Sequence, residues 1–406
     1  MTAAPGPWDL FVVTAPGLEE ITGGELAALG LPPLGVEPGG LGLKGDPAIL
    51  WRLNLHLRTA SRVLVRVAAF RAVGFQELEK RARRVSWGDF LPPGTDPSAV
   101  EFEVTCRKSR LYHSGAVEAR LREAMAEVLG ARGRGASGGA ASAGALSADQ
   151  GVVRHPDPVP APRFVVRLLR NRLTLSADAS GEHLHRRGYR EAVGKAPLRE
   201  TLAAALLLAA GWRGERPLLD PFCGSGTLPI EAALLAGGVA PGLGRRFAFE
   251  AWPGVDPEEG LRARAEAMPD AAAPAGPGTS GGATPMIRGT DRDPGAIRAA
   301  RENAARAGVS ERVEFVQAAL SEAPFPAPPG LLATNPPYGH RVGDAATLRN
   351  LYARLGDRLR TDWSGGDVVL LSADRALTAQ LGLETRVLFR TRNGGIPVEA
   401  VAARIP

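Results

Sequence analysis

The stretch Thr334-Asn335-Pro336-Pro337-Tyr338 follows the apolar run 331–333 and carries residue types suited to holding a planar amine. Proline fixes its own φ and keeps the preceding residue extended, so the two prolines hold the loop open. Neither proline has an N–H, which leaves the Asn335 side-chain oxygen and the Pro336 carbonyl as acceptors, beside the flat face of Tyr338. The same residues are also ordinary turn chemistry, so the loop alone leaves both interpretations open.

A glycine-containing loop, Asp220-Pro-Phe-Cys-Gly-Ser-Gly-Thr, is expected where a first strand turns into a helix. Glycines at that place let a ligand approach the backbone beyond the carboxyl end of the strand. The loop lacks the lysine of a Walker A motif, and Pro229 stands where a dinucleotide fingerprint needs its third glycine. The loop therefore favours a compact cofactor without phosphates over ATP or NAD.

The next expected strand ends in Gly289-Thr-Asp291-Arg-Asp293. A carboxylate at that position can accept both hydroxyls of a ribose, and we favour this role for Asp291. Asp293 is better placed to cap the following helix. Together with the glycine loop and the Asn-Pro-Pro-Tyr loop, Asp291 fits S-adenosyl-L-methionine and a methyl acceptor.

Two kinds of region must position these loops. The second half alternates apolar strands and helices, which predicts a doubly wound, mostly parallel sheet ending in a hairpin at Asn393-Gly394. The first half predicts a smaller α+β region. Expected strands are 10–13, 41–43, 62–68, 101–106, two within 163–176, 218–220, 286–291, 312–317, 331–334, 367–371, 385–390 and 397–403; expected helices are 18–29, 76–85, 115–128, 198–210, 227–235 and 294–307.

Composition limits the classes of protein further. Only two cysteines are present, so neither a disulfide framework nor a zinc cluster is expected, and no metal site is indicated. No run of about 18 apolar residues and no signal-peptide pattern occur, so we expect a soluble, cytoplasmic chain without membrane contact. Residues 131–162 and about 268–285 are poor in large apolar residues and are expected to be flexible insertions.

Positive charge is concentrated in one segment of the chain. The formal net charge is +6, and 45 Arg against 4 Lys indicate a compositional bias that makes single arginines weak indicators. Residues 163–216 hold 11 basic and 5 acidic residues, whereas residues 1–130 hold 15 of each and residues 217–406 hold 20 and 21. A local excess favours contact with a polyanion at one surface.

These motifs resemble those of THUMP-containing class I RNA methyltransferases, which modify the N2 amine of guanine. The likeness lies in the two loops, in 188–200, and in N-terminal stretches such as Val13-Thr-Ala-Pro-Gly-Leu-Glu-Glu and Leu111-Tyr-His-Ser-Gly. It implies a ferredoxin-like and THUMP region over 1–180, with THUMP at about 44–178, and a seven-stranded Rossmann-like methyltransferase domain over 181–406. Residues 245–252 look more like the branch acting on large-subunit ribosomal RNA than the tRNA branch.

The resemblance also implies roles for single residues. Asn335, Pro336, Pro337 and Tyr338 would hold the target base. The expected cofactor contacts are Pro197, Leu198, Asp220, Phe222, Cys223, Gly224, Gly226 and Asp291, and the expected RNA contacts are Arg107, Lys108, Arg110, Arg186, Arg187 and Arg190. Ala319 departs from the family, which often has an acidic residue facing the adenine at that position. The resemblance therefore does not identify the residues that contact the adenine.

Other functions stay open from the sequence. The Asn-Pro-Pro-Tyr loop serves any planar amine or amide, so adenine N6 in DNA and a protein glutamine are rival acceptors, and tRNA is a rival to 23S ribosomal RNA. A non-catalytic RNA-binding assembly factor with a vestigial cofactor fold is a further alternative, which the absence of S-adenosylmethionine binding would favour. We expect the chain to work as a monomer.

Overall fold

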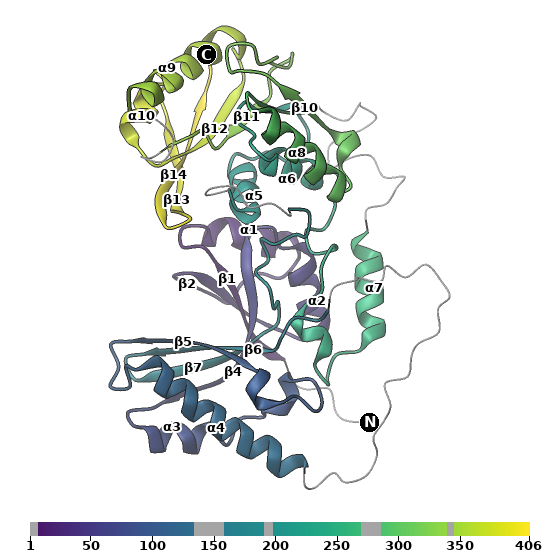
Figure 1. The fold of residues 1–406 in the computed structure, drawn as a ribbon, viewed down its shortest axis with the longest axis vertical. Helices are drawn as coiled ribbons and strands as arrows, with labels where there is room; N and C mark the ends of the chain where they lie inside the picture. The colour runs from purple at the N-terminus through teal and green to yellow at the C-terminus, as the bar shows by residue number, and fades with distance from the viewer. Residues whose placement is uncertain (1–6, 134–157, 191–197, 269–285, 339–344) are drawn as a thin grey trace.

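The computed structural model describes residues 7–133, 158–190, 198–268, 286–338 and 345–406. Its two halves each contain one seven-stranded sheet, and the N-terminal sheet lies below the C-terminal one in Figure 1. Most of the two predicted flexible insertions falls outside the described residues. The proposed domain limit near residue 180 stays a prediction.

The first sheet has the strand order β2-β3-β1-β4-β7-β6-β5. Neighbours run antiparallel except β5 and β6, which are parallel. Its elements are β1 (Trp8–Thr14), α1 (Glu19–Ala28), β2 (Gly35–Glu37), β3 (Gly40–Gly45), α2 (Pro47–His56), β4 (Ala60–Arg71), α3 (Phe75–Ala82), β5 (Glu101–Arg107), α4 (Ser114–Gly133), β6 (Arg163–Leu169) and β7 (Arg172–Asp178).

Two elements of this half were not predicted. Helix α2 begins with the Asp46 side chain accepting a hydrogen bond from the Ile49 N–H, with Pro47 at the first helical position, which is a regular helix entry. Strand β2 is three residues long and exposed throughout. Its sequence carries no burial pattern, so only its pairing with β3 makes it a strand.

The second sheet confirms the predicted doubly wound α/β class. Its order is β10-β9-β8-β11-β12-β14-β13, parallel as far as β12 and antiparallel in the last two strands. The elements are α5 (Glu200–Ala209), β8 (Leu218–Asp220), α6 (Thr227–Ala236), α7 (Pro257–Ala267), β9 (Ile287–Asp291), α8 (Pro294–Arg306), β10 (Val313–Gln317), β11 (Leu331–Thr334), α9 (Ala345–Asp362), β12 (Asp367–Ser372), α10 (Arg375–Ala379), β13 (Arg386–Asn393) and β14 (Ile396–Arg404). Helices α7, α9 and α10 were not predicted.

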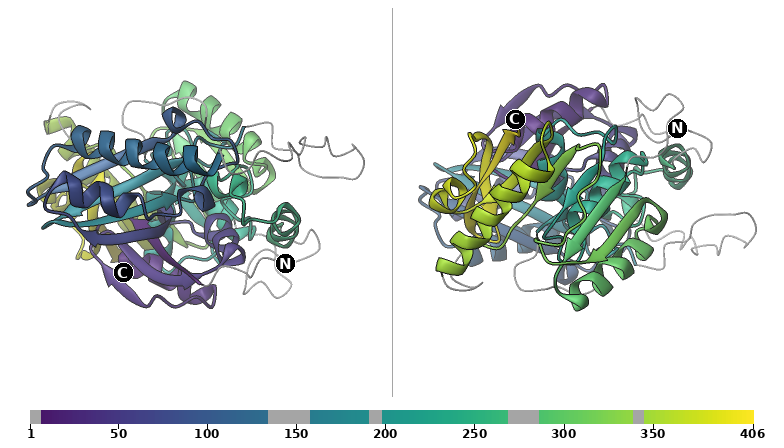
Figure 2. Two further views of the ribbon diagram at one scale, coloured as in Figure 1. Left: turned by 90° about the horizontal axis from the view of Figure 1, so that it is seen from below. Right: turned by 90° about the horizontal axis from the view of Figure 1, so that it is seen from above.

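Successive residues of the central strands serve opposite helix layers. Leu218 and Leu331 pack with apolar residues of α5, α6 and α8, whereas their neighbours Leu219 and Leu332 pack with α9 and α10. Figure 2 shows helices flanking this sheet on both sides. The apolar runs that predicted these strands therefore reflect burial on both faces of a parallel sheet.

Residues 240–267 belong to the C-terminal half by sequence but complete the core of the N-terminal half. The rings of Trp51 and Phe249 lie 4.7 Å apart between centroids, and those of Phe90 and Trp252 lie 5.2 Å apart. Helix α7 lies beside α2 in Figure 1 and contacts it. The two halves are therefore joined by a shared apolar core as well as by the chain.

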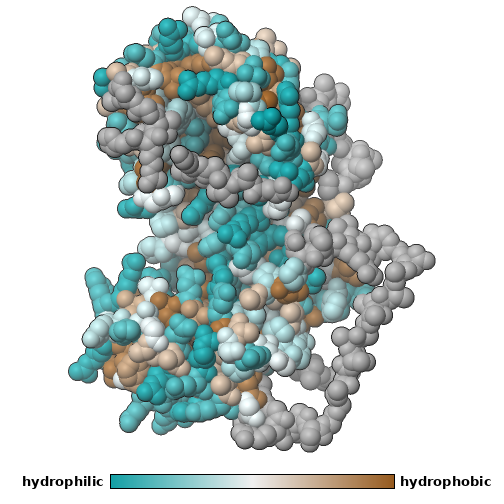
Figure 3. Space-filling view, in the orientation of Figure 1, coloured by the Kyte–Doolittle hydropathy of each residue, from teal (hydrophilic) through white to brown (hydrophobic). Residues whose placement is uncertain are grey.

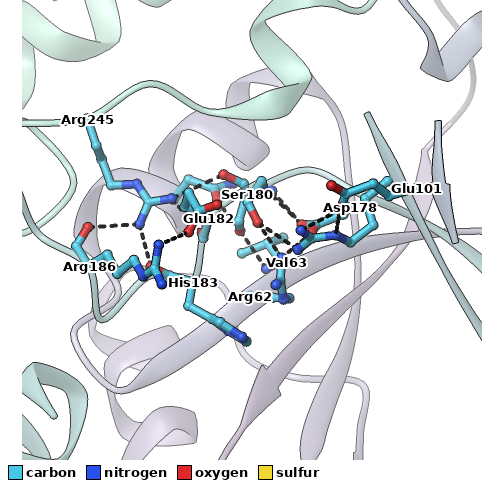
Figure 4. A network of polar contacts seen from close by, with 12 residues as sticks. Arg62, Val63, Glu101, Asp178, Ser180, Glu182, His183, Arg186 and Arg245 are labelled. Carbon is cyan, nitrogen blue, oxygen red and sulfur yellow. Dashed lines mark hydrogen bonds and ion pairs between the residues drawn. The ribbon is translucent and has the colours of Figure 1, made fainter. Parts of the chain in front are cut away.

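Arg245, from the same segment, holds the connection between the two halves (Figure 4). Its guanidinium is largely buried and donates only to backbone carbonyls of the connecting segment. The acceptors are the carbonyl oxygens of Ser180 at 3.2 Å, Glu182 at 2.5 Å, His183 at 2.7 Å and Arg186 at 3.2 Å. On the face seen in Figure 3, the surface between the two halves is mainly hydrophilic. Hydrophobic residues gather around a hollow in the upper half of the same view.

Replacing Phe249 with alanine is expected to lower the free energy of unfolding by about 3–5 kcal/mol, because a fully buried ring leaves the core of the first sheet. Leu261→Ala on α7, where the side chain is 42% exposed, is the control and should change it by about 0.5 kcal/mol or less. Urea denaturation measures both. If Phe249→Ala lowered the free energy of unfolding as little as Leu261→Ala, Phe249 would not be part of the folded core.

Candidate active site

The residues predicted to hold cofactor and base meet at one edge of the second sheet. Strands β9, β8 and β11 are parallel neighbours in that order, so their carboxyl ends point to the same side. The glycine loop follows β8, Asp291 ends β9, and residues 335–338 follow β11. Ligands of doubly wound sheets bind at such an edge.

A buried hydrogen bond joins the glycine loop to the Asn-Pro-Pro-Tyr loop. The Thr334 hydroxyl donates to Asp220 Oδ1 over 2.6 Å, and the Phe222 N–H donates to the same oxygen over 3.1 Å. Burial raises the pKa of Asp220 to about 7; the charge of Asp291 adds to this rise, and the two hydrogen bonds oppose it. Asp220 can therefore gain or lose its proton near neutral pH when a charged ligand arrives.

The glycine loop is fixed against the end of β9. The Cys223 N–H donates to the Thr290 carbonyl over 3.0 Å, and the Gly224 N–H donates to Asp291 Oδ2 over 3.0 Å. Cys223 is buried, and burial raises the pKa of its thiol well above the usual range. It remains a neutral thiol at physiological pH, which agrees with a packing role for Cys223 and not a nucleophilic one.

Gly226 marks the point where the loop enters α6. Its φ is +84°, and a Cβ there would lie 2.8 Å from Phe315 Cζ and 2.9 Å from Ala300 Cβ. Both the backbone angle and the space therefore require glycine. This close approach keeps the loop against α8 and β10.

Asp291 and Asp293 have separate roles. The Asp291 carboxylate accepts from Gly224 and, through Oδ1, from the Asp293 N–H over 3.0 Å. A carboxylate has further lone pairs, which stay able to accept ribose hydroxyls. Asp293 accepts from the Gly295 N–H over 2.8 Å and caps α8, as its position in the sequence indicated.

The Asn-Pro-Pro-Tyr loop presents an unpaired acceptor. Asn335 Oδ1 is buried and has no hydrogen-bond partner within the described structure. An unpaired buried acceptor costs free energy, and a ligand N–H would recover it. Tyr338 is partly buried against the core, and its hydroxyl accepts a hydrogen bond from Asn393 Nδ2 over 2.8 Å. Burial raises the pKa of Tyr338, so its hydroxyl keeps its proton.

These residues fit a nucleoside-linked amino acid such as S-adenosylmethionine. The glycine loop supplies close backbone, Asp291 supplies ribose acceptors, and Asp220 supplies a carboxyl group for a cationic substituent. Leu198, also expected at the cofactor, is buried before α5. Phe222 packs against the α9 layer, and Pro197 lies outside the described residues.

Two arginines expected to bind RNA are buried instead. The Arg187 side chain is 3% exposed, donates to the carbonyls of Leu184 and Arg58, and pairs with Glu231 at 3.5 Å. Its donors are directed into the protein, so they cannot reach a phosphate at the surface.

The second of these arginines, Arg190, is also buried, contrary to the prediction that it contacts RNA. Its side chain is 10% exposed, pairs with Glu200 at 3.4 Å, and donates to the Leu198 carbonyl over 2.9 Å and to Thr227 Oγ1. Arg190 therefore ties the lead-in to α5 to the first turn of α6, beside the glycine loop. It supports the expected cofactor site and does not bind RNA at the surface.

The remaining expected RNA contacts are exposed. Arg186 is 67% exposed and pairs with Glu182, four residues earlier in the connecting segment. Arg107 ends β5, and Lys108 and Arg110 lie on the loop that follows, at one end of the first sheet. We use "basic tip" for the exposed cluster there, in which no member pairs with a described carboxylate: Arg71, Arg107, Lys108, Arg110, Arg170 and Arg172.

Two residues at the candidate site had no assigned role in the sequence. Thr334 could have been noticed as a hydroxyl ending an apolar strand. Asn393 was predicted only as part of a hairpin turn, and nothing in the sequence links it to Tyr338. Within the described ranges, no group of three or more His, Cys, Asp or Glu could hold a metal ion, and no described helix is long and apolar enough to cross a membrane.

Comparisons with known proteins agree with this arrangement. The family model of an RMKL-like methyltransferase domain matches residues 187–401, and that of the RlmL ferredoxin-like domain matches residues 9–64. A Synechocystis protein named as a candidate RNA methyltransferase is 33% identical, over 95% of this chain and 94% of that protein. The ribosomal RNA large subunit methyltransferase K/L of Chromohalobacter salexigens is 36% identical, over 98% of this chain and 52% of that protein. The chain thus spans about half the length of the K/L relatives it matches.

Solved structures share the whole architecture. A candidate methyltransferase complexed with SAH superposes with a TM-score of 0.81 at 28% identity, covering 99% of both chains. A Listeria monocytogenes protein, described as a predicted N6-adenine-specific DNA methylase, gives 0.80 at 31% identity, covering 98% of this chain and 97% of that one. TrmN from Thermus thermophilus shares the fold with a TM-score of 0.66 at 22% identity.

The raised pKa of Asp220 predicts pH-dependent cofactor binding. A cationic ammonium group bound near Asp220 favours the ionised carboxylate, so affinity for S-adenosylhomocysteine should rise by about tenfold between pH 6 and pH 8. The rise should be centred near pH 7. Asp220→Asn should remove it, because an amide does not titrate. Calorimetry at both pH values measures it, and a wild-type affinity independent of pH would contradict it.

Proposed function

The chain belongs to the family of RMKL-like methyltransferases, and from that membership we propose that it methylates the exocyclic N2 amine of a guanine in large-subunit ribosomal RNA. The methyl donor is S-adenosyl-L-methionine. The observation that carries the choice of a planar amine is Asn335 Oδ1, a buried acceptor without a partner in the described structure, on the loop that is bonded to the glycine loop through Thr334.

The chain's own residues act by position and hydrogen bonding. S-adenosylmethionine, when bound, supplies an electrophilic methyl group. Asn335 Oδ1 and the Pro336 carbonyl would each accept one hydrogen of the target amine, which turns the nitrogen lone pair out of conjugation with the ring. The amine would thereby be made nucleophilic without a strongly basic side chain, and the proton that it loses as the new carbon–nitrogen bond forms would pass to solvent.

The target base must be unpaired to reach this loop. Tyr338 offers an aromatic face beside Asn335, and a base extruded from a helix or taken from a single strand would stack there. The ring rests on the core of the second sheet, so its face is held in a defined place. This arrangement suits a guanine in a loop or a locally opened stem.

The basic tip supplies the contact with the rest of the RNA. Its arginines and lysine are exposed and not neutralised by described carboxylates, and Tyr112 beside them is 80% exposed. Such a surface binds phosphates and stacks on an unpaired base. The tip lies in the N-terminal half, so the substrate must extend along the molecule beyond the target nucleotide.

The choice of RNA and base rests on likeness. The Synechocystis relative is named for RNA, and the relatives of double length are named for large-subunit ribosomal RNA. The motifs resemble those of guanine-N2 methyltransferases. Adenine N6 is the second candidate, because the Listeria neighbour carries that description and the same loop can hold the adenine amine.

The product identifies the function. We expect N2-methylguanosine in 23S ribosomal RNA after incubation of purified protein, S-adenosylmethionine and RNA from a strain lacking the gene. Mass spectrometry of digested RNA, compared with tRNA and DNA as substrates, makes the measurement. N6-methyladenine would select the second candidate, and methylation of tRNA alone would overturn the ribosomal assignment.

Asn335→Ala should lower kcat by about 100-fold or more, because the transition state loses a preorganised hydrogen-bond partner. Affinity for S-adenosylhomocysteine should stay within about threefold of wild type, since the glycine loop and Asp291 are unchanged. Asn335→Asp, which keeps an acceptor oxygen, should lose less activity. Wild-type methylation by Asn335→Ala would refute the assigned role.

Combined alanine replacement of Arg107, Lys108 and Arg110 should weaken RNA binding by about tenfold or more and reduce its dependence on salt. The control is a triple variant with the same charge change, made at side chains that are 71%, 76% and 67% exposed: Arg262, Arg375 and Arg404. Fluorescence anisotropy over a salt series compares the two. Equal loss in both variants would show that only net charge matters.

A further inference from the structure

The hairpin between β13 and β14 does not need an asparagine in its turn. Asn393 pairs with Ile396, and the two residues between them, Gly394 and Gly395, have φ of +56° and +88°. Both central residues of this turn are thus left-handed and both are glycine. The Asn-Gly pair predicted the hairpin, but Asn393 stands before the turn with ordinary strand backbone.

The side chain of Asn393 is instead directed into the protein. Asn393 is 6% exposed, and its Nδ2 donates to the Tyr338 hydroxyl over 2.8 Å. Its Oδ1 is buried and lacks a partner in the described structure. A polar side chain buried at this cost, without need for it in the turn, indicates a role at Tyr338.

The strand that carries Asn393 is anchored at its base. β14 pairs through Glu399–Arg404 with the full length of β12, so the base of the hairpin extends the central sheet, and Asn393 lies beyond that pairing, next to the turn. At its other side Gly17 lies so close to β13 that a Cβ would be 1.8 Å from the Arg390 carbonyl oxygen. The hairpin is therefore held by the sheet and by the N-terminal half together.

Tyr338 needs such a support. It follows two prolines on the loop after β11, and its side chain is only partly buried against the core of the second sheet. A tyrosine ring turns about two torsions, and one hydrogen bond at its hydroxyl fixes the direction of the ring. Asn393 supplies that bond from a different element.

We propose that Asn393 is a positioning residue that fixes the direction of the long axis of the Tyr338 ring for the incoming base. The inference rests on the proposed function, in which that ring receives the base. Loss of Asn393 should therefore lower the rate of methyl transfer more than the affinity for cofactor or RNA, since a displaced base reacts slowly although it still binds.

A double-mutant cycle tests this inference. Asn393→Ala and Tyr338→Phe each remove one side of the same hydrogen bond, so each should lower kcat by about tenfold, with KM for S-adenosylmethionine within about twofold of wild type. The double variant should be no slower than the slower single variant, because the shared bond is lost only once. Effects that multiply, or wild-type kcat in Tyr338→Phe, would overturn the proposal.

Thr391→Val is the matched control on the same strand. Thr391 is 8% exposed, and its hydroxyl is also buried without a described partner. Valine keeps its shape, so kcat should remain near wild type; a loss equal to that of Asn393→Ala would show a general effect of the strand and overturn the proposal.

Separate measurements distinguish loss of the positioning role from loss of stability and from a wrong substrate assignment. Thermal unfolding and binding of S-adenosylhomocysteine report on folding, and if Asn393→Ala fails either, Asn393→Leu keeps the volume and removes the amide. A wild-type protein that methylates guanine while the cycle is additive overturns this inference alone. A wild-type protein that methylates another amine contradicts the proposed substrate, and the cycle is then measured on that acceptor.

Discussion

The contact on which the site depends is the buried hydrogen bond from the Thr334 hydroxyl to the Asp220 carboxyl. It exists because β8 and β11 are neighbours at the centre of the sheet, in the register that pairs Leu331 with Leu218. That adjacency is the point where the strand order reverses, so the loops after the two strands diverge and leave a crevice between them. The glycine loop and the Asn-Pro-Pro-Tyr loop face each other for this topological reason.

The many arginines of the chain serve its interior as much as its surface. Arg245 donates to four carbonyls of the connecting segment, and Arg187 and Arg190 pair with buried glutamates. The guanidinium group suits this use because it has five donors in a fixed plane. Part of the positive charge of residues 163–216 therefore lies on buried arginines that join elements inside the protein. A count of charged residues cannot distinguish such arginines from exposed ones that bind a polyanion.

The sequence predicted those parts of the fold and site that depend on local chemistry. Apolar runs identified the central strands, and the glycine loop, Asp291 and the Asn-Pro-Pro-Tyr loop were placed at strand ends, where the structure has them. Features that depend on distant contacts were missed or misassigned. Strand β2 has no pattern of its own, Asn393 meets Tyr338 only through the fold, and the burial of Arg187 is decided by Glu231 and the Arg58 carbonyl.

Under the proposed function, the candidate site would recognise the amine, and the arrangement of the two halves would recognise the larger molecule. Asn335 and Tyr338 would hold any planar amine, so they would not distinguish guanine from adenine by themselves. The basic tip lies at the ends of β5 and β7 in the N-terminal half, and the candidate site follows β11 in the C-terminal half (Figure 1); the apolar core around Trp51 and Phe249 joins the two halves. A free nucleotide would occupy only one of the two. In the proposed function a folded RNA would bind both, and the junction between the halves would then determine which of its bases reaches Asn335.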